Sequence, residues 1–235
     1  MITLQELREN SLKKIGGLFD ILDQENLLVK NSRVVETSFV KNFDRVYDMQ
    51  YSLDRRKKIF QDEKEFKEFL QKNAKYGITE KNFMFDFRVS SAHYLLSLQE
   101  LISRFLMEIL DIETLQLNKE RATLGTTIRK IAEYRDLEGK PVFIENGLRK
   151  IFNVKMRNTI GHDKWWFDEN NNFCMEGEEP FTEEEFYGEI IASSVLLSSI
   201  AISYMTKKFP ESLKQLMREI DSYSQDKNQQ DFKNS

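Results

Sequence analysis

The segment Ser91–Leu110, SAHYLLSLQELISRFLMEIL, carries the strongest fold signal in the chain. Its apolar side chains recur every three or four residues and form one stripe, which consists of Leu95, Leu98, Ile102, Phe105 and Ile109. This period is typical of an amphipathic α-helix, whose apolar face is buried against other elements. We interpret His93, near the start of the segment, as structural, because nothing in the sequence pairs it with the other histidine, His162.

The segments that follow show the same helical character. Apolar positions predict helices over residues 121–135 and 142–158. Thr182 and Glu185 have the spacing of a capping box, in which each side chain bonds the backbone N–H of the other residue. The helix that they open has no charged residue over 190–206, but it contains serines that allow close packing. We therefore predict a central buried helix rather than a membrane span.

After residue 162 the helical pattern stops. Residues 164–168 and 172–175 are rich in aromatic and apolar side chains and flank Glu169-Asn170-Asn171, which predicts a β-hairpin or an ordered loop. The chain therefore predicts a mainly α fold, a helical bundle with a small β-hairpin after the helix over 142–158. The predicted parts are an N-terminal helical extension over residues 1–78, a helical domain over 79–223 and a disordered tail over 224–235.

Composition indicates a soluble globular protein. The 235 residues are 40% hydrophobic and 31% charged, and only 3 prolines limit the length of helices. No basic-then-apolar signal peptide opens the sequence, and the single Cys174 fits a reducing compartment, so we expect a cytoplasmic protein with no membrane contact. With 2 histidines, 1 cysteine and no carboxylate spacing of a magnesium or calcium loop, we expect no metal and no cofactor.

One stretch, Lys155-Met156-Arg157-Asn158-Thr159-Ile160-Gly161-His162, holds residues suited to catalysis. Arg157 has a planar donor fork that fits phosphate oxygens. His162 offers an imidazole, the side chain that takes and gives protons most readily near neutral pH. Asn158 donates and accepts hydrogen bonds, so it suits the orientation of either group. This set fits metal-free RNA cleavage, in which a base takes the proton of the ribose 2′-hydroxyl and a cation stabilises the phosphate charge.

The spacing of Arg157 and His162 determines whether their side chains can lie on the same face of a helix. Five positions along an ideal helix turn a side chain by about 500°, which leaves it roughly 140° from the starting face. Arg157 and His162 therefore share a face in one of two ways. Either the helix bends or ends at Gly161, or two copies of the motif meet across a dimer.

At Arg157-Asn158-x-x-x-His162 the chain resembles the R-polar-x-x-x-H signature of HEPN domains, over about residues 90–210. The resemblance implies an all-helical, metal-independent endoribonuclease of a toxin–antitoxin or other antiviral defence system. Arg157 would contact the scissile phosphate, His162 would be the general base or acid, and Asn158 would orient them. The resemblance also implies a homodimer with a composite site, RNA as substrate, and an antitoxin or nucleotidyltransferase as a further partner.

The charge around the motif differs from the net charge of −4, which argues against a broad coat of nucleic acid. Residues 149–164 carry a local +4, from Arg149, Lys150, Lys155, Arg157 and Lys164 against Asp163, whereas residues 176–189 hold seven glutamates and no cation. We predict that Arg149, Lys155 and Lys164 bind RNA and that Trp165 stacks on a base. The alternatives are that both charge runs are solvated faces and that at least one of Trp165 and Trp166 covers the bundle end.

A second basic run, Arg55-Arg56-Lys57-Lys58, allows two interpretations. It either contacts a phosphate backbone or forms an exposed helix face, and the mixed charge of the next segment favours the exposed face.

The motif also has a structural interpretation, in which His162 packs at a helix end and Arg157 is a surface charge. The chain would then be a non-catalytic helical scaffold that binds a nucleotide, an RNA or a protein. Turnover of RNA distinguishes the two hypotheses, because both allow a dimer.

Overall fold

The computed structural model describes residues 3–31, 39–118, 122–215 and 218. Two compact units make up the chain: a terminal unit of residues 1–30 and 195–235, and a core unit of residues 31–194. This division differs from the predicted boundary at residue 78, because the segment before that residue packs with the helices that follow it. The predicted tail over 224–235 lies outside the described residues.

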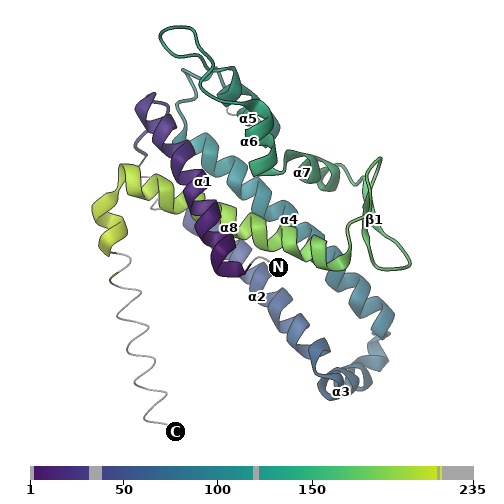
Figure 1. The fold of residues 1–235 in the computed structure, drawn as a ribbon. Helices are drawn as coiled ribbons and strands as arrows, with labels where there is room; N and C mark the ends of the chain where they lie inside the picture. The colour runs from purple at the N-terminus through teal and green to yellow at the C-terminus, as the bar shows by residue number, and fades with distance from the viewer. Residues whose placement is uncertain (1–2, 32–38, 119–121, 216–217, 219–235) are drawn as a thin grey trace. The chain divides into compact units, whose positions relative to one another are not determined.

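The described part of the chain is mainly helical, as predicted, with one small two-stranded sheet (Figure 1). The helices are α1 (Leu4–Gln24), α2 (Phe39–Gln61), α3 (Glu63–Asn73), the 3-10 helix η2 (Ala74–Tyr76), α4 (Glu80–Ile109), α5 (Leu124–Glu133), α6 (Glu145–Phe152), α7 (Val154–Gly161) and α8 (Glu183–Lys208). Thr182 and Glu185 form the predicted capping box. The backbone N–H of Thr182 donates to Glu185 Oε2 at 2.8 Å, and the backbone N–H of Glu185 donates to Thr182 Oγ1 at 3.2 Å.

Helix α4 is the central element of the core unit. It begins well before the predicted start at residue 91, because the Thr79 side chain caps it by accepting from the N–H of Asn82 at 3.2 Å. The predicted apolar stripe is buried, with Leu95, Leu98 and Ile102 at most 1% exposed. Helices α2, α5 and α7 all pack against α4, and α3 lies where the chain turns from α2 towards α4 (Figure 1).

The predicted single helix over residues 142–158 is wrong. The chain forms α6 up to Phe152, turns at Asn153 and continues as α7 from Val154. Asn153 has a φ of 42°, a left-handed conformation that asparagine tolerates better than most residues. Its Nδ2 donates to Glu189 Oε2 of α8 at 2.6 Å, which stabilises the break. The motif therefore lies on a separate short helix.

The predicted β-hairpin after the motif is confirmed. Strand β1 (Trp165–Phe167) pairs antiparallel with β2 (Phe173–Met175), and Trp166 lies opposite Cys174. Asn171 adopts a φ of 65° in the connecting turn. The turn is closed by the Asp168 carboxylate, which accepts the N–H groups of Asn170 and Asn172 at 2.9 and 2.8 Å.

An aromatic cluster of Trp165, Phe167, Phe173 and Phe186 attaches this hairpin to the helices. Phe173 is fully buried and stacks on Phe186 with ring centroids 4.5 Å apart, and on Trp165 at 5.6 Å. The same core contains Met156 and Ile160 of α7, together with Ala92 and Leu95 of α4. The hairpin is consequently packed beside the motif helix.

The terminal unit brings α1 together with the second half of α8. Ile15, Phe19 and Tyr204 are fully buried, and the Tyr204 hydroxyl donates to the Val29 carbonyl at 2.9 Å. Of the helices in the described residues, α8 is long and apolar enough to cross a membrane by length and composition alone. Of its most apolar stretch, 44% is buried within the protein, and the choice between a core helix and a membrane span stays a prediction.

Candidate functional site

Helix α7 carries the motif and ends at it. His162 is the C-cap, and the two backbone bonds of a Schellman ending follow it. The left-handed residue of this ending is Asp163, with a φ of 54°, so Gly161 lies in regular helix. Helix α7 therefore ends at Gly161, as one of the two expected geometries requires, and does so without a bend between Arg157 and Gly161.

Arg157 lies on the face of α7 that packs against α4. Its Nη2 forms an ion pair with Glu100 of α4, and its Nη1 donates to Asn158 Oδ1 at 3.1 Å. The side chain is only 16% exposed, and its buried Nε has no hydrogen-bond partner among the described residues. The guanidinium is thus held in place with a carboxylate already bound. A phosphate that binds Arg157 must displace Glu100 or share the guanidinium with it.

Sequence reasoning did not identify Glu100. The signal that identifies it is a second stripe on α4, in which His93, Leu96 and Glu100 recur at three and four positions beside the apolar stripe. A Cβ added to Gly161 would lie 3.7 Å from Leu96 Cδ1, so the end of α7 rests on this stripe. The residue that pairs with Arg157 is therefore specified by helix packing.

His162 is exposed at the end of α7. Its side chain makes no hydrogen bond or ion pair within the described residues, with Arg157 or with any other side chain. In one copy of the chain, Arg157 is bound by Glu100 and Asn158, whereas the imidazole of His162 has no hydrogen-bond or ion-pair partner among the described residues. The other predicted arrangement, in which two motifs meet across a dimer, stays a prediction.

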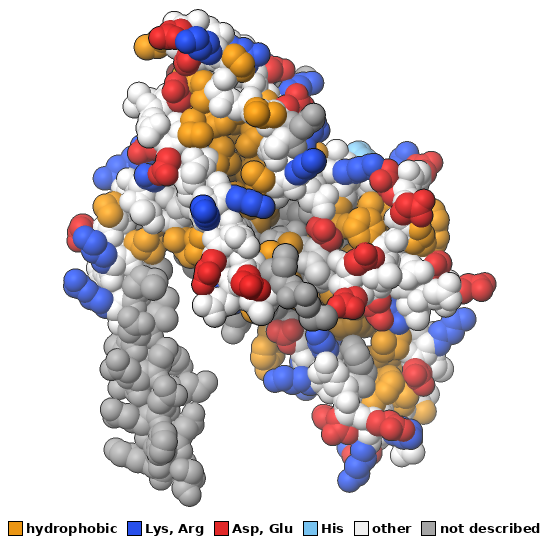
Figure 2. Space-filling view, in the orientation of Figure 1, with side chains coloured by type: hydrophobic (Ala, Val, Ile, Leu, Met, Phe, Trp, Pro, Cys, Tyr) orange, Lys and Arg blue, Asp and Glu red, His pale blue; other side chains and the backbone are white. Residues whose placement is uncertain are grey.

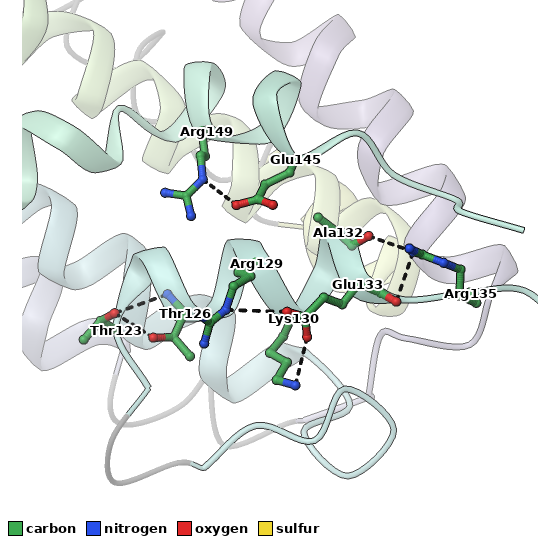
Figure 3. A network of polar contacts seen from close by, with 9 residues as sticks. All are labelled: Thr123, Thr126, Arg129, Lys130, Ala132, Glu133, Arg135, Glu145 and Arg149. Carbon is green, nitrogen blue, oxygen red and sulfur yellow. Dashed lines mark hydrogen bonds and ion pairs between the residues drawn. The ribbon is translucent and has the colours of Figure 1, made fainter.

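The three basic residues predicted to bind RNA are each paired with a glutamate. Arg149 Nε donates to Glu145 Oε1 at 2.6 Å along α6, as Figure 3 shows. Lys164 Nζ contacts Glu176 Oε2 at 2.7 Å. Lys155 forms an ion pair with Glu178, completing the set.

These ion pairs bring two glutamates of the acidic stretch over residues 176–189 to the basic side chains of the motif segment. The hairpin turns the chain back, so Glu176 and Glu178 lie against Lys164 and Lys155. A hydrogen bond from Lys164 holds the pKa of the Glu176 carboxyl below its ordinary value. Acidic and basic side chains are also intermixed over the visible face in Figure 2. These two glutamates reduce the local +4 counted along residues 149–164 to +2.

The two tryptophans occupy different environments. Trp165 is half-buried in the aromatic cluster, and its ring meets that of His93 edge to face, with centroids 6.3 Å apart. Trp166 is 53% exposed. Stacking of Trp165 on an RNA base stays a prediction, but the exposed face of Trp166 offers the larger surface for a base.

Metal ligands do not gather at this site. Within the described residues, no three His, Cys, Asp or Glu side chains lie close enough together to hold a metal ion.

No protein-family model, no curated protein and no solved structure matches the chain.

Proposed function

We propose that this protein is a metal-independent endoribonuclease of HEPN type that acts in the cytoplasm as a homodimer. The observation that supports it is the short helix α7, which carries a held arginine and ends in an unpaired imidazole. Glu100 and Asn158 hold Arg157, and His162 faces solvent. Positioned donors stabilise the charge of a transition state without reorganising, which suits this arrangement to phosphate chemistry.

In the proposed reaction, His162 takes the proton of a ribose 2′-hydroxyl. The 2′-oxygen forms a bond to the adjacent phosphorus, and the bond from phosphorus to the 5′-oxygen breaks as that oxygen takes up a proton. The products are a 2′,3′-cyclic phosphate and a 5′-hydroxyl. Arg157 stabilises the phosphate oxygens, and Asn158 keeps the guanidinium oriented. No hydrogen bond or ion pair joins these two side chains within the described residues, so in the proposed dimer Arg157 acts together with the partner's His162.

We further propose, from the resemblance, that this reaction serves toxin–antitoxin or antiviral defence, with an antitoxin or nucleotidyltransferase as partner. We then expect cells to tolerate expression of the wild-type chain poorly and replacement of Arg157 to relieve the effect. Growth after induction measures this directly.

The decisive experiment incubates the purified chain with mixed cellular RNA in excess EDTA. We expect fragments with 2′,3′-cyclic phosphate ends, and we expect Arg157→Ala and His162→Ala to abolish them. Arg88→Ala is the matched arginine control, because Arg88 pairs with Glu183 at 3.1 Å and is 13% exposed, close to the burial of Arg157. His93→Ala is the histidine control. Unchanged cleavage by a folded His162→Ala variant contradicts the assigned role.

A second candidate function is a non-catalytic scaffold. The carboxylate partners of Arg149, Lys155, Arg157 and Lys164 favour it, because each cation already has an internal anion. Absence of cleavage by the folded wild type, with the chain still dimeric, supports this candidate.

A further inference from the structure

A cleft distant in sequence from the motif lies between α2, η2 and the start of α4 in the core unit. Its volume is about 530 Å³, within the range of small-ligand sites. The residues that line it come from positions 52–86. The cleft therefore contains part of the second basic run, Arg55-Arg56-Lys57-Lys58, and reaches into the start of α4.

The cationic wall of this cleft is the second basic run. Arg55 and Arg56 both line it. Arg56 Nη1 donates to Ser90 Oγ at 3.3 Å, whereas the exposed Arg55 makes no ion pair or side-chain hydrogen bond among the described residues. Asp86 is the one acidic residue of the lining, so the charge of the cleft is +1. A guanidinium without an internal anion is the group that an anionic ligand binds at the lowest cost.

Aromatic residues also line the cleft. Phe69 and Phe83 meet edge to face with centroids 5.2 Å apart. Tyr76 also lines the cleft, is 70% exposed, and has Lys75 Nζ 4.9 Å from its ring centroid. The left-handed Gly77, with a φ of 73°, ends η2 and turns the chain towards α4, which places Tyr76 at the rim. A large exposed aromatic ring beside unpaired positive charge is a platform for a planar anionic ligand.

We propose that this cleft binds a nucleotide, with the phosphate on Arg55 and the base against Tyr76. Asn82 also lines the cleft; its Nδ2 donates to the Gly77 carbonyl at 3.5 Å, so its Oδ1 accepts from the base edge, and Asp86 accepts from an exocyclic amino group. The nucleotide is either free or part of a single strand, since both present the same phosphate and base. The proposal does not depend on cleavage at the motif.

Isothermal titration calorimetry of the full chain, in EDTA at fixed salt, tests this proposal. The probes are AMP, adenosine and a short 2′-O-methyl oligonucleotide, which presents phosphates and bases but lacks the hydroxyl that ribonuclease chemistry requires. We expect saturable binding with a Kd below about 1 mM. Binding of AMP identifies a free nucleotide, and binding of the oligonucleotide alone identifies a strand. Binding of neither, or adenosine binding as tightly as AMP, overturns the proposal.

Two variants assign the binding to the cleft. Arg55→Gln removes the charge and should weaken AMP or oligonucleotide binding roughly 10-fold. Tyr76→Ala should weaken it roughly 5-fold to 100-fold. The controls are Lys58→Gln and Tyr51→Ala, which alter exposed side chains of the same helix α2 outside the cleft. Equal weakening by the controls overturns the assignment, and RNA cleavage by Arg55→Gln shows whether the motif works independently.

Discussion

The motif on α7 and the cleft beside α2 both present arginines, but their charges are in different states. At the motif, Arg157 is bound to Glu100, and the neighbouring Lys155 and Lys164 are bound to glutamates of the hairpin segment. In the cleft, Arg55 has no anionic partner among the described residues. The difference shows that a count of cations along the sequence does not measure the charge that a ligand encounters.

The largest expected effect on stability comes from disrupting the aromatic cluster that anchors the hairpin before Glu176 and Glu178. Phe173→Ala removes a fully buried ring from the aromatic cluster, so we expect a loss of about 3–5 kcal/mol in the free energy of unfolding. Urea denaturation measures it. Trp166→Ala, which truncates a 53% exposed ring of the same hairpin, should cost much less. Equal losses would show that the hairpin is not anchored through Phe173.

The next effect tests the internal anion at the motif. Glu100→Gln leaves the mostly buried guanidinium of Arg157 without its carboxylate, which should cost roughly 1–3 kcal/mol of unfolding free energy. The same variant should bind a phosphate-bearing oligonucleotide more tightly, because Arg157 becomes available. Glu183→Gln, which removes the partner of Arg88, is the control for stability and should leave that affinity unchanged. Unchanged affinity in Glu100→Gln would mean that Arg157 is structural.

A smaller effect of opposite sign tests the geometry of the motif helix. Gly161→Ala places a methyl group 3.7 Å from Leu96 Cδ1, an ordinary contact, in regular helix, so we expect stabilisation by roughly 0.5 kcal/mol. Gly139→Ala, at a φ of 77°, should instead destabilise by roughly 1 kcal/mol. Thermal unfolding of both variants checks the contrast. Destabilisation by Gly161→Ala would indicate that the helix does bend there.

The smallest effect concerns the exposed pair of Lys164 and Glu176. Because the pKa of Glu176 is lowered in the folded chain, the pair stabilises the fold above the ordinary carboxyl value of 4.5 and loses this contribution as pH falls through the lowered value. Glu176→Gln should therefore change stability little at pH 7 and flatten its decline in acid. Denaturation at several pH values measures the slope, and an unaltered slope would mean that the pair contributes nothing.

Sequence periodicity identified the elements of the motif region but not its break. Leu148, Phe152, Met156 and Ile160 step by four residues, so a single helix satisfies the pattern. The actual chain turns at Asn153, because the left-handed backbone is supported by a hydrogen bond to Glu189, far along the sequence. A period describes which side chains face inwards and contains no information on a contact with a distant residue.

The residue types and their local order determined a mainly helical chain, the capping box of Thr182 and Glu185, and the hairpin after the motif, because these depend on neighbours within a few positions. Only the tertiary structure decided which charges are available. In the folded chain, Glu100 pairs with Arg157, and Glu176 and Glu178 pair with Lys164 and Lys155. Arg55, which lines the cleft, has no anionic partner among the described residues. The physical reason is that the strength of an ion pair depends on the distance between charges in space, which folding sets independently of their separation along the chain.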